Sequence, residues 1–480
     1  MTRLIPSIVL AGAGILTWAG ATAAQAAGNP ADVGTAVAAQ IACAGIFVSG
    51  RTEADVLRDD VHALAPFARA VTLSVDRKRR TVAAAAPGAT TRTALYRPVV
   101  GCTLLTGKTS VAALDGQVAR LRPARARADN GVRLTPGAPI RPAAIDRAAL
   151  DAAVARAFDE QNKDGYPDTR AMLVVQHGAI VAERYAPGFD RDTRLLGWSA
   201  TKSITAALIG LLVDDGVLQL DAPAPVPEWQ GAGDPRAAIT LRQLLNMASG
   251  LTFNESYEPG SDSLQMLFAA SDMAAYAASR PLQHAPGTTW SYSSGTSNIL
   301  SGIVFRATGG TLEAVTRFAR TRLFEPAGMR SALIEPDEAG VPVGSSYGYA
   351  TARDWARFGQ LFLDRGRADG KQILSSGWVD FVRAPTTAAP RPLYGGQFWL
   401  NRGDDSGARK RMFADLPTDT FMALGHNEQI VAVIPSLDAV VVRLGWTPEG
   451  VDFDSNGYIG AIAAALEPGA AAKRAAVSPQ

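Results

Sequence analysis

Apolar residues recur at the spacing of one helix face shortly before Gly216, a residue that is typical of a helix end. The members of this face are Ile204, Ala207, Leu208, Leu211 and Leu212. The same spacing predicts helices over residues 145–158, 299–304 and 459–466. A Thr-x-x-Gln capping box at Thr240 predicts one more helix, which Gly250 is expected to end.

Shorter apolar runs predict strands. Residues 172–176 and 179–185 flank His177-Gly178, which is a hairpin signal. Residues 429–434 and 439–444 are joined by a Pro-Ser-Leu-Asp turn, and we interpret them as a central hairpin. Hairpins mixed with helices predict an α+β fold, in which helices cover an antiparallel sheet.

The pattern over residues 27–122 predicts a small α+β unit. No catalytic or binding motif is recognisable in it. Its expected elements are a helix over residues 52–64 and strands over 71–75, 81–86 and 94–97. The basic run at residues 77–80 falls between two of these strands, and we interpret it as a solvated hairpin tip. The charge pattern therefore gives no reason to expect a nucleic-acid partner.

The prolines of residues 123–142 predict a linker or a strap over the surface. A large domain is expected over residues 143–467. The Ala- and Pro-containing tail, residues 468–480, is expected to be disordered.

The N-terminus has the pattern of a secretory signal over residues 1–26. Arg3 provides the positive charge, residues 8–21 form a short apolar run, and Ala24-Gln25-Ala26 fits a cleavage site. An uncleaved membrane anchor is the alternative, although the run is short for a span. The chain of 480 residues, with a net charge of +2 and 47% hydrophobic residues, is otherwise typical of a globular protein. We expect an exported protein, periplasmic or extracellular, without an integral membrane segment after signal removal.

The chain has two cysteines, Cys43 and Cys102, and both lie in the N-terminal unit. In an oxidising compartment such a pair is expected to form a disulfide. Two separate buried thiols are the alternative.

One short segment carries candidate chemistry. Ser199 and Lys202 are three residues apart, and on a helix this spacing places both side chains on one face. Serine needs a nearby base to become a nucleophile, and lysine can be that base when burial lowers its pKa. The start of a buried helix also favours a developing oxyanion. An ordinary amphipathic helix with a solvated lysine is the alternative.

Two later segments offer partners for this pair. Tyr292 precedes a predicted helix and could exchange a proton with Ser199 or with a leaving group. A core tyrosine bonded to backbone is the alternative. His426 precedes the predicted strand at residues 429–434, whose edge could supply an oxyanion-hole N–H group. An ordinary polar strand start is the alternative.

The order and spacing of these three elements resemble the serine β-lactamase/penicillin-binding-protein superfamily. The similarity is to its class C-like branch of esterases, β-lactamases and 6-aminohexanoate-dimer hydrolases, and it covers roughly residues 145–465. Further similar stretches are residues 244–251, 323–329, 352–359 and 434–438. The resemblance implies a β-lactamase/transpeptidase-like fold, with an antiparallel sheet flanked by helices and an all-helical lobe.

The resemblance also implies roles for individual residues. Ser199 is similar to the family nucleophile, Lys202 to its base, and Tyr292 to the tyrosine of the second element. Ser294 stands where many members have Asn and others have Ser. His426 stands where the third element has Lys or His.

The end of the third element is where the sequence departs from the family. Gln429 follows this element, and its N–H group, with that of Ser199, would form the oxyanion hole. Glu428 stands where most members have Gly, so it adds bulk and negative charge. β-Lactams carry a carboxylate, which members of the family hold beside the third element. We expect the negative charge of Glu428 to repel this carboxylate and so to disfavour β-lactams as substrates. A Glu428 side chain that points away from the cleft is the alternative.

Taken together, these residues predict a serine hydrolase that cleaves a small-molecule ester or amide through an acyl-enzyme. The four histidines form no HExxH zinc motif, and we expect no metal. No cofactor is expected either. The alternatives are an exported binding or regulatory protein with little turnover, and a true β-lactamase or D-amino peptidase.

Overall fold

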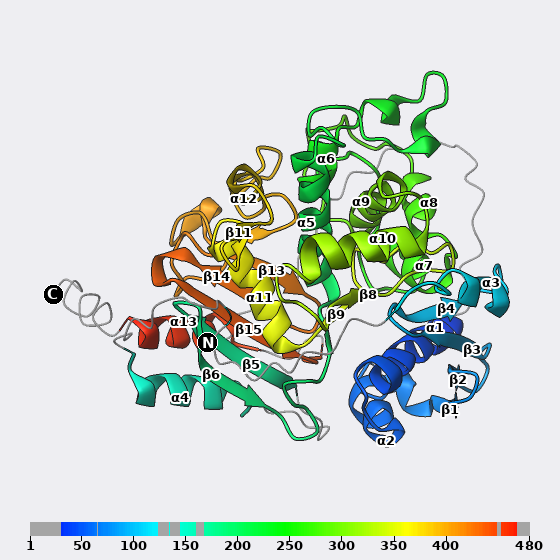
Figure 1. Cartoon of the computed structure of the whole chain (residues 1–480), viewed down its shortest axis with the longest axis horizontal. Coiled ribbons are helices and arrows are strands. Elements are labelled where there is room, and N and C mark those ends of the chain that lie inside the picture. Colours follow the sequence, from blue (N-terminus) through cyan, green and yellow to red (C-terminus); the bar gives the residue numbers. More distant parts are fainter. Residues whose placement is uncertain are drawn as a thin grey trace.

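The computed structural model describes residues 30–64, 66–122, 134, 145–159, 168–448 and 453–467 (Figure 1). The expected signal peptide, the C-terminal tail and the linker, apart from Leu134, lie outside these residues.

A six-stranded antiparallel sheet forms the centre of the large domain, in the order β12-β13-β14-β15-β5-β6. The strands are β5 (Thr169–Gln176), β6 (Ala179–Tyr185), β12 (Trp399–Leu400), β13 (Phe421–Gly425), β14 (Gln429–Ile434) and β15 (Ala439–Gly445). Both predicted hairpins are confirmed, because Gln176 pairs with Ala179 and Ile434 pairs with Ala439.

Helices cover both faces of this sheet (Figure 1). Alternate side chains of β5 point to opposite faces, so that Met172 joins the core under α4 and α13, while Leu173 joins the core under α11. These helices are α4 (Arg147–Arg156), α11 (Ala352–Leu363) and α13 (Ser455–Leu466). Burial on both faces explains why β5, β14 and β15 contain continuous apolar runs, at residues 171–175, 430–434 and 439–442.

A helical lobe lies beside the sheet (Figure 1). It consists of α5 (Thr201–Asp214), α6 (Leu241–Leu245), α7 (Asp262–Ala269), α8 (Met273–Ala278), α9 (Ser294–Ala307) and α10 (Leu312–Phe318). The remaining elements are α12 (Ser376–Val382), the small sheet of β7 (Leu195–Leu196), β8 (Leu333–Ile334) and β9 (Gly348–Ala350), and the pair β10 (Arg367–Ala368) and β11 (Lys371–Gln372). The α+β class and the helical lobe are as predicted.

The predicted capping box is confirmed, but the predicted end of its helix is wrong. The Thr240 hydroxyl accepts a hydrogen bond from the Gln243 N–H, and the Gln243 side chain bonds back to the Thr240 N–H. Helix α6 then ends at Leu245, before Gly250. Gly250 has a φ of +80°, and a Cβ there would lie 2.2 Å from the His284 carbonyl oxygen. Glycine is therefore required at position 250 by its positive φ and by the close approach of the His284 backbone, and not by a helix end.

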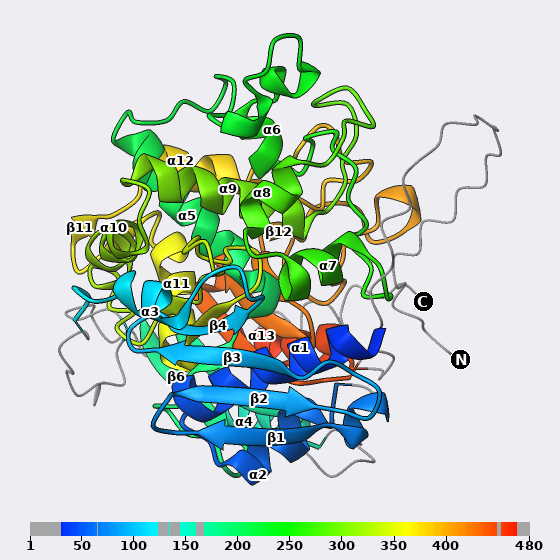
Figure 2. The same cartoon turned by 90° about the vertical axis from the view of Figure 1, so that its right-hand side faces the viewer.

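The N-terminal unit is a four-stranded antiparallel sheet with one long helix packed on it (Figure 2). Its elements are α1 (Pro30–Cys43), α2 (Glu53–Val56), β1 (Thr72–Asp76), β2 (Thr81–Ala85), β3 (Arg92–Arg97), β4 (Gly101–Leu105) and α3 (Val111–Gly116). The predicted helix start at Thr52 and the basic hairpin tip between β1 and β2 are confirmed. Helix α1 and strand β4 are additional to the prediction.

Buried polar contacts join the N-terminal unit to the large domain. The Glu335 carboxylate accepts hydrogen bonds from the Cys102 N–H at 2.6 Å and from Gln40 Nε2 at 2.7 Å. Arg170 pairs with Asp60 at 2.5 Å. Apolar side chains also meet at this boundary.

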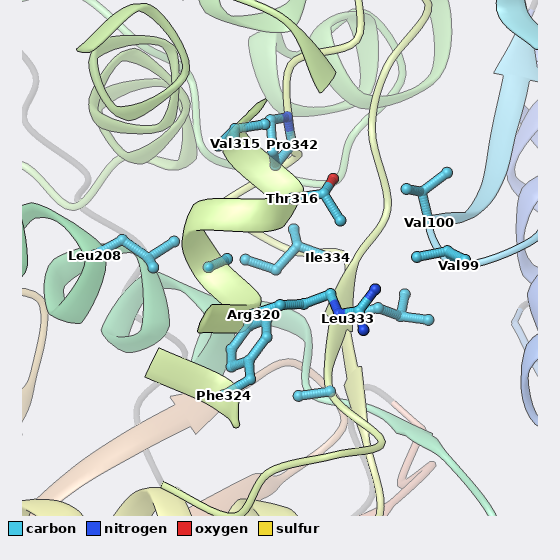
Figure 3. Close-up of a pocket in the computed structure, with 12 residues that line it drawn as sticks. Val99, Val100, Leu208, Val315, Thr316, Arg320, Phe324, Leu333, Ile334 and Pro342 are labelled. Atoms are coloured by element: carbon cyan, nitrogen blue, oxygen red, sulfur yellow. The ribbon is translucent and has the colours of Figure 1, made fainter. Parts of the chain in front are cut away.

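Figure 3 shows part of that apolar boundary, at a small cavity. Val99 and Val100, from the turn between β3 and β4, line it together with Leu333 and Ile334 of β8. Residues of both parts belong to one continuous core. The N-terminal unit is therefore packed into the large domain.

One described segment, Ala31–Val48, is long and apolar enough to cross a membrane, and 72% of it is buried within the fold. It comprises α1 and the turn after it, and it packs on the N-terminal sheet. A buried core helix accounts for this segment.

Cys43 at the end of α1 is bonded to Cys102 in β4, as predicted. The bond closes a loop with a sequence separation of 59 residues, which corresponds to about 4 kcal/mol of unfolding free energy in the chain-entropy model. We expect the double variant Cys43→Ser/Cys102→Ser to lose stability of this order in denaturant titrations. Thiol titration of the denatured, unreduced wild type should find no free thiol, and two free thiols would contradict the bond.

Candidate active site

The segment around Ser199 is a tight turn that leads into α5. Ser199 lies in a short 3₁₀ helix, Trp198–Ala200, and α5 begins at the next residue. Trp198 has a φ of +45°, which is rare for a bulky residue and marks local backbone strain. A Cβ at Gly197 would lie 2.2 Å from the Trp355 ring, so only glycine fits there. The chain therefore presents Ser199 at the amino end of a buried helix.

Lys202 lies within hydrogen-bonding distance of the predicted nucleophile. Its Nζ atom donates to Ser199 Oγ at 2.9 Å, to Ser294 Oγ at 3.0 Å and to the Ser345 carbonyl oxygen at 3.0 Å. The residue is 1% exposed. Burial lowers the pKa of Lys202 to about 8, while the charge of Glu255 acts in the opposite direction. With this pKa, about a tenth of the Lys202 amine is neutral at pH 7, far more than for an exposed lysine.

Tyr292 completes the group from the segment that precedes α9. Its ring centre lies 5.0 Å from Lys202 Nζ, and its hydroxyl shares a hydrogen bond with Ser199. Desolvation and the nearby negative charge of Glu255 raise the pKa of Tyr292 well above 10. Tyr292 is therefore a neutral phenol that can donate or relay a proton, and it is not a phenolate base in the resting site.

Glu255 is a further member of this group, and the sequence did not predict it. The Ser294 N–H donates to Glu255 Oε2 at 2.7 Å, and Ser294 Oγ donates to Glu255 Oε1 at 2.5 Å. Desolvation raises the pKa of Glu255, and the charge of Lys202 opposes that shift. A hydrogen-bonded chain thus runs from Glu255 through Ser294 and Lys202 to Ser199.

The predicted third element borders the other side of the nucleophile. Gly425 ends β13, and a Cβ on it would lie 2.2 Å from the Gly197 carbonyl oxygen. The next residue, His426, has its ring 5.6 Å from that of Trp198 and 4.7 Å from that of Tyr257. Desolvation lowers the pKa of His426 to about 4, so the imidazole is neutral at pH 7. It cannot supply a positive charge for a substrate carboxylate.

Gln429 stabilises the turn that carries His426. Its Nε2 atom donates to the carbonyl oxygens of His426, Asn427 and Gly445, at 3.0, 3.1 and 2.7 Å. Asn427 and Glu428 in this turn have φ values of +59° and +61°. The Gln429 side chain is therefore a positioning group for His426, and its N–H group remains the predicted oxyanion donor.

Glu428 is directed toward helix α13. Its Oε2 atom accepts a hydrogen bond from Ser455 Oγ at 2.6 Å. It is absent from the described lining of the cavity beside Trp198. This agrees with the alternative that the sequence left open, in which the Glu428 side chain points away from the substrate. The structure therefore gives no basis for the expectation that Glu428 sets the charge preference of the substrate.

This arrangement is suited to nucleophilic catalysis. A hydroxyl at a helix start touches a buried amine of lowered pKa and a neutral phenol, which are the groups that acyl transfer through serine requires. Among the residues that the structure describes, no cluster of three or more His, Cys, Asp or Glu side chains is placed to hold a metal ion.

The fold is that of the serine β-lactamase and penicillin-binding-protein superfamily. The family model described as Beta-lactamase matches residues 154–464, which is more than half of the chain. The chain belongs to the Beta-lactamase family.

Two relatives are hydrolases. A 6-aminohexanoate-dimer hydrolase of Paenarthrobacter ureafaciens is 28% identical over 327 residues, covering 62% of this chain and 78% of that protein. Esterase EstB of Burkholderia gladioli is 31% identical over 224 residues, covering 41% of this chain and 56% of that protein. The chain thus spans just over half the length of the esterase.

Solved structures share the fold. EstCE1, a hydrolase with promiscuous acyltransferase activity, superposes with a TM-score of 0.53 at 16% identity, covering 67% of this chain and 99% of that chain. A family VIII carboxylesterase gives a TM-score of 0.50 at 18% identity, covering 67% of this chain and 96% of that chain.

Proposed function

We propose that this protein is an exported serine hydrolase that cleaves an ester or amide through an acyl-enzyme on Ser199. The observation that carries the proposal is the 2.9 Å hydrogen bond between Lys202 Nζ and Ser199 Oγ. The Lys202 side chain is buried, and this burial lowers its pKa to about 8. Ester or amide chemistry is also in keeping with the named activities of the two hydrolase relatives. Export is supported by the signal-like N-terminus and the Cys43–Cys102 bond.

Acylation begins with neutral Lys202, which accepts the Ser199 proton as Ser199 Oγ bonds to the substrate carbonyl carbon. The carbonyl oxygen becomes an oxyanion, which we assign to the N–H groups of Ser199 and Gln429. The protonated Lys202 is stabilised by the Ser294 hydroxyl, the Ser345 carbonyl and the charge of Glu255.

Collapse of this intermediate breaks the bond to the leaving group. The leaving oxygen or nitrogen receives a proton from the Tyr292 hydroxyl. The proton that Lys202 holds then returns to this hydroxyl; the Nζ atom of Lys202 lies 5.0 Å from the centre of the Tyr292 ring. Water then attacks the acyl-enzyme with the same groups as base and acid, and Ser199 is regenerated. No step requires His426 to be charged.

A hydrolysis screen tests the proposal. The purified protein should hydrolyse p-nitrophenyl esters, nitrocefin or short amides in at least one class, and Ser199→Ala should abolish that activity. Turnover that survives in Ser199→Ala, or the absence of turnover across all three classes, would contradict the proposed function.

The pH dependence of this activity follows from the environment of Lys202. The neutral amine is the active form, so kcat/KM should rise with pH through the Lys202 pKa of about 8. Glu255 raises this pKa, so Glu255→Gln should move the rise to lower pH. The measurement is kcat/KM for a neutral ester from pH 5.5 to 9.5.

Glu313→Gln is a matched control, because Glu313 lies in α10 and pairs with Arg317 at the surface. It should leave the profile unchanged. A Glu255→Gln profile that coincides with wild type, or that moves to higher pH, would show that Glu255 does not tune Lys202.

A further inference from the structure

A cavity of about 670 Å³ lies between the N-terminal unit and the predicted active site. Val33 and Val37, one turn apart on α1, line one side together with Leu64. The large domain contributes Leu264 and Phe268 of α7 to the opposite side. Figure 2 shows α1 and α7 next to each other. The cavity is thus shared between the unit without assigned chemistry and the hydrolase domain.

The N-terminal side of this cavity is held firmly in place. Arg92 of β3 donates to the Phe268 carbonyl oxygen at 3.2 Å. The contacts of Glu335 and Asp60 and the Cys43–Cys102 bond fix the remainder of the unit. The wall that α1 provides is therefore part of the folded molecule, and its position relative to α7 is defined.

The described lining is mostly apolar. No Asp, Glu, Lys or Arg occurs among the described residues that line it. Its polar members include Thr35, Tyr257, Asn427 and His426, and the low pKa of His426 keeps that ring neutral. Such a surface favours an uncharged apolar group and penalises a charged one, which would lose its hydration without gaining a partner.

The lining of the cavity includes two residues that neighbour the nucleophile segment. Trp198, which lines the cavity, directly precedes Ser199. His426, which also lines it, follows Gly425, and Gly425 closely approaches the Gly197 carbonyl. A substrate whose carbonyl sits at Ser199 therefore has this cavity within reach of one of its two substituents.

We propose that the N-terminal unit forms one wall of a substrate subsite, and that this subsite binds an extended alkyl or aromatic group of the ester or amide. This inference rests on the proposed function of Ser199. It assigns to residues 30–122 a role in substrate selection that the hydrolase domain alone would lack. The group that enters is uncharged, whether it belongs to the acyl part or to the leaving part of the substrate.

The expected signature is a dependence of kcat/KM on chain length. Each methylene that leaves water for the cavity should raise kcat/KM by up to about fourfold, until the cavity is filled. Two substrate series distinguish the two parts of the substrate: p-nitrophenyl esters from acetate to decanoate, and acetate esters of alcohols of increasing length. The series that shows the gain identifies the part that enters.

Variants on α1 link this gain to the N-terminal unit. Val33→Phe adds bulk to the α1 wall and narrows the cavity, so it should reduce kcat/KM for the longest preferred substrate at least tenfold, with acetate hydrolysis within about twofold of wild type. Val33→Ser makes the wall polar without adding volume and should flatten the chain-length dependence. Val111→Phe is the matched control, since Val111 belongs to the same unit but is 44% exposed and does not line the cavity.

The outcomes separate this inference from the proposed function. If p-nitrophenyl acetate is cleaved in a Ser199-dependent manner but neither series gains with length, the subsite is refuted and the proposed function stands. Equal losses on short and long substrates in Val33→Phe, with an unchanged melting temperature, would also refute it. If Ser199→Ala retains the activity of wild type, the proposed function fails, and the subsite has no reaction to serve.

Discussion

Ser199→Ala is expected to lose hydrolytic activity by roughly 10⁴-fold or more on the preferred substrate, because the substitution removes the oxygen that forms the acyl bond. The fold should be retained, since Ser199 is only partly buried and the substitution removes a single oxygen atom. The measurement is kcat/KM, accompanied by the melting temperature.

The melting temperature of Ser199→Ala is informative because Ser199 is also a hydrogen-bond partner of Lys202. Removing Ser199 Oγ deletes one of the three hydrogen bonds of Lys202 and leaves those to Ser294 and Ser345. A near-normal melting temperature with activity lost would place the effect in the chemistry. Activity within tenfold of wild type would show that another residue is the nucleophile.

Lys202→Met is expected to lower kcat by about 10³-fold, because it keeps much of the side-chain volume but removes the amine that accepts the Ser199 proton. Lys202→Arg should be impaired to a similar extent, since a guanidinium stays protonated and cannot act as a base. The comparison separates proton transfer from simple positive charge. If Lys202→Arg retains most of the activity, electrostatic stabilisation is the role of Lys202, and the base is elsewhere.

Much of the fold was predictable because its core elements have simple local patterns. The hairpin of β5 and β6 was marked by His177-Gly178, and both residues have positive φ values. The continuous apolar runs of β14 and β15 reflect burial on both faces of the sheet. The positions of Ser199, Lys202 and Tyr292 followed from spacing and from the family resemblance.

Helix α1 shows where local pattern fails. Much of it is Ala, Gly and Val, and most of its middle is buried, so it lacks the polar stripe that identifies a surface helix. Helices α7 and α8 were missed within a polar stretch because each has eight residues or fewer. Their N-caps, Ser261 and Asp272, were the only local signals of helix starts.

Glu255 could not be found from the sequence for a different reason. It stands alone in a polar loop, 56 residues after Ser199, with no spacing relation to the three elements of the site. Only the tertiary fold brings it to Ser294 and Lys202. The direction of Glu428 likewise depends on α13, which supplies Ser455 as its partner.

The central claim is that Ser199 becomes covalently acylated through activation by Lys202. The most direct measurement is the intact mass of the protein after incubation with a fluorophosphonate probe, followed by peptide mapping. We predict one adduct, on Ser199, in wild type, none in Ser199→Ala, and greatly slowed labelling in Lys202→Met. An adduct on a different residue, or an unlabelled wild type that still hydrolyses esters, would contradict this account.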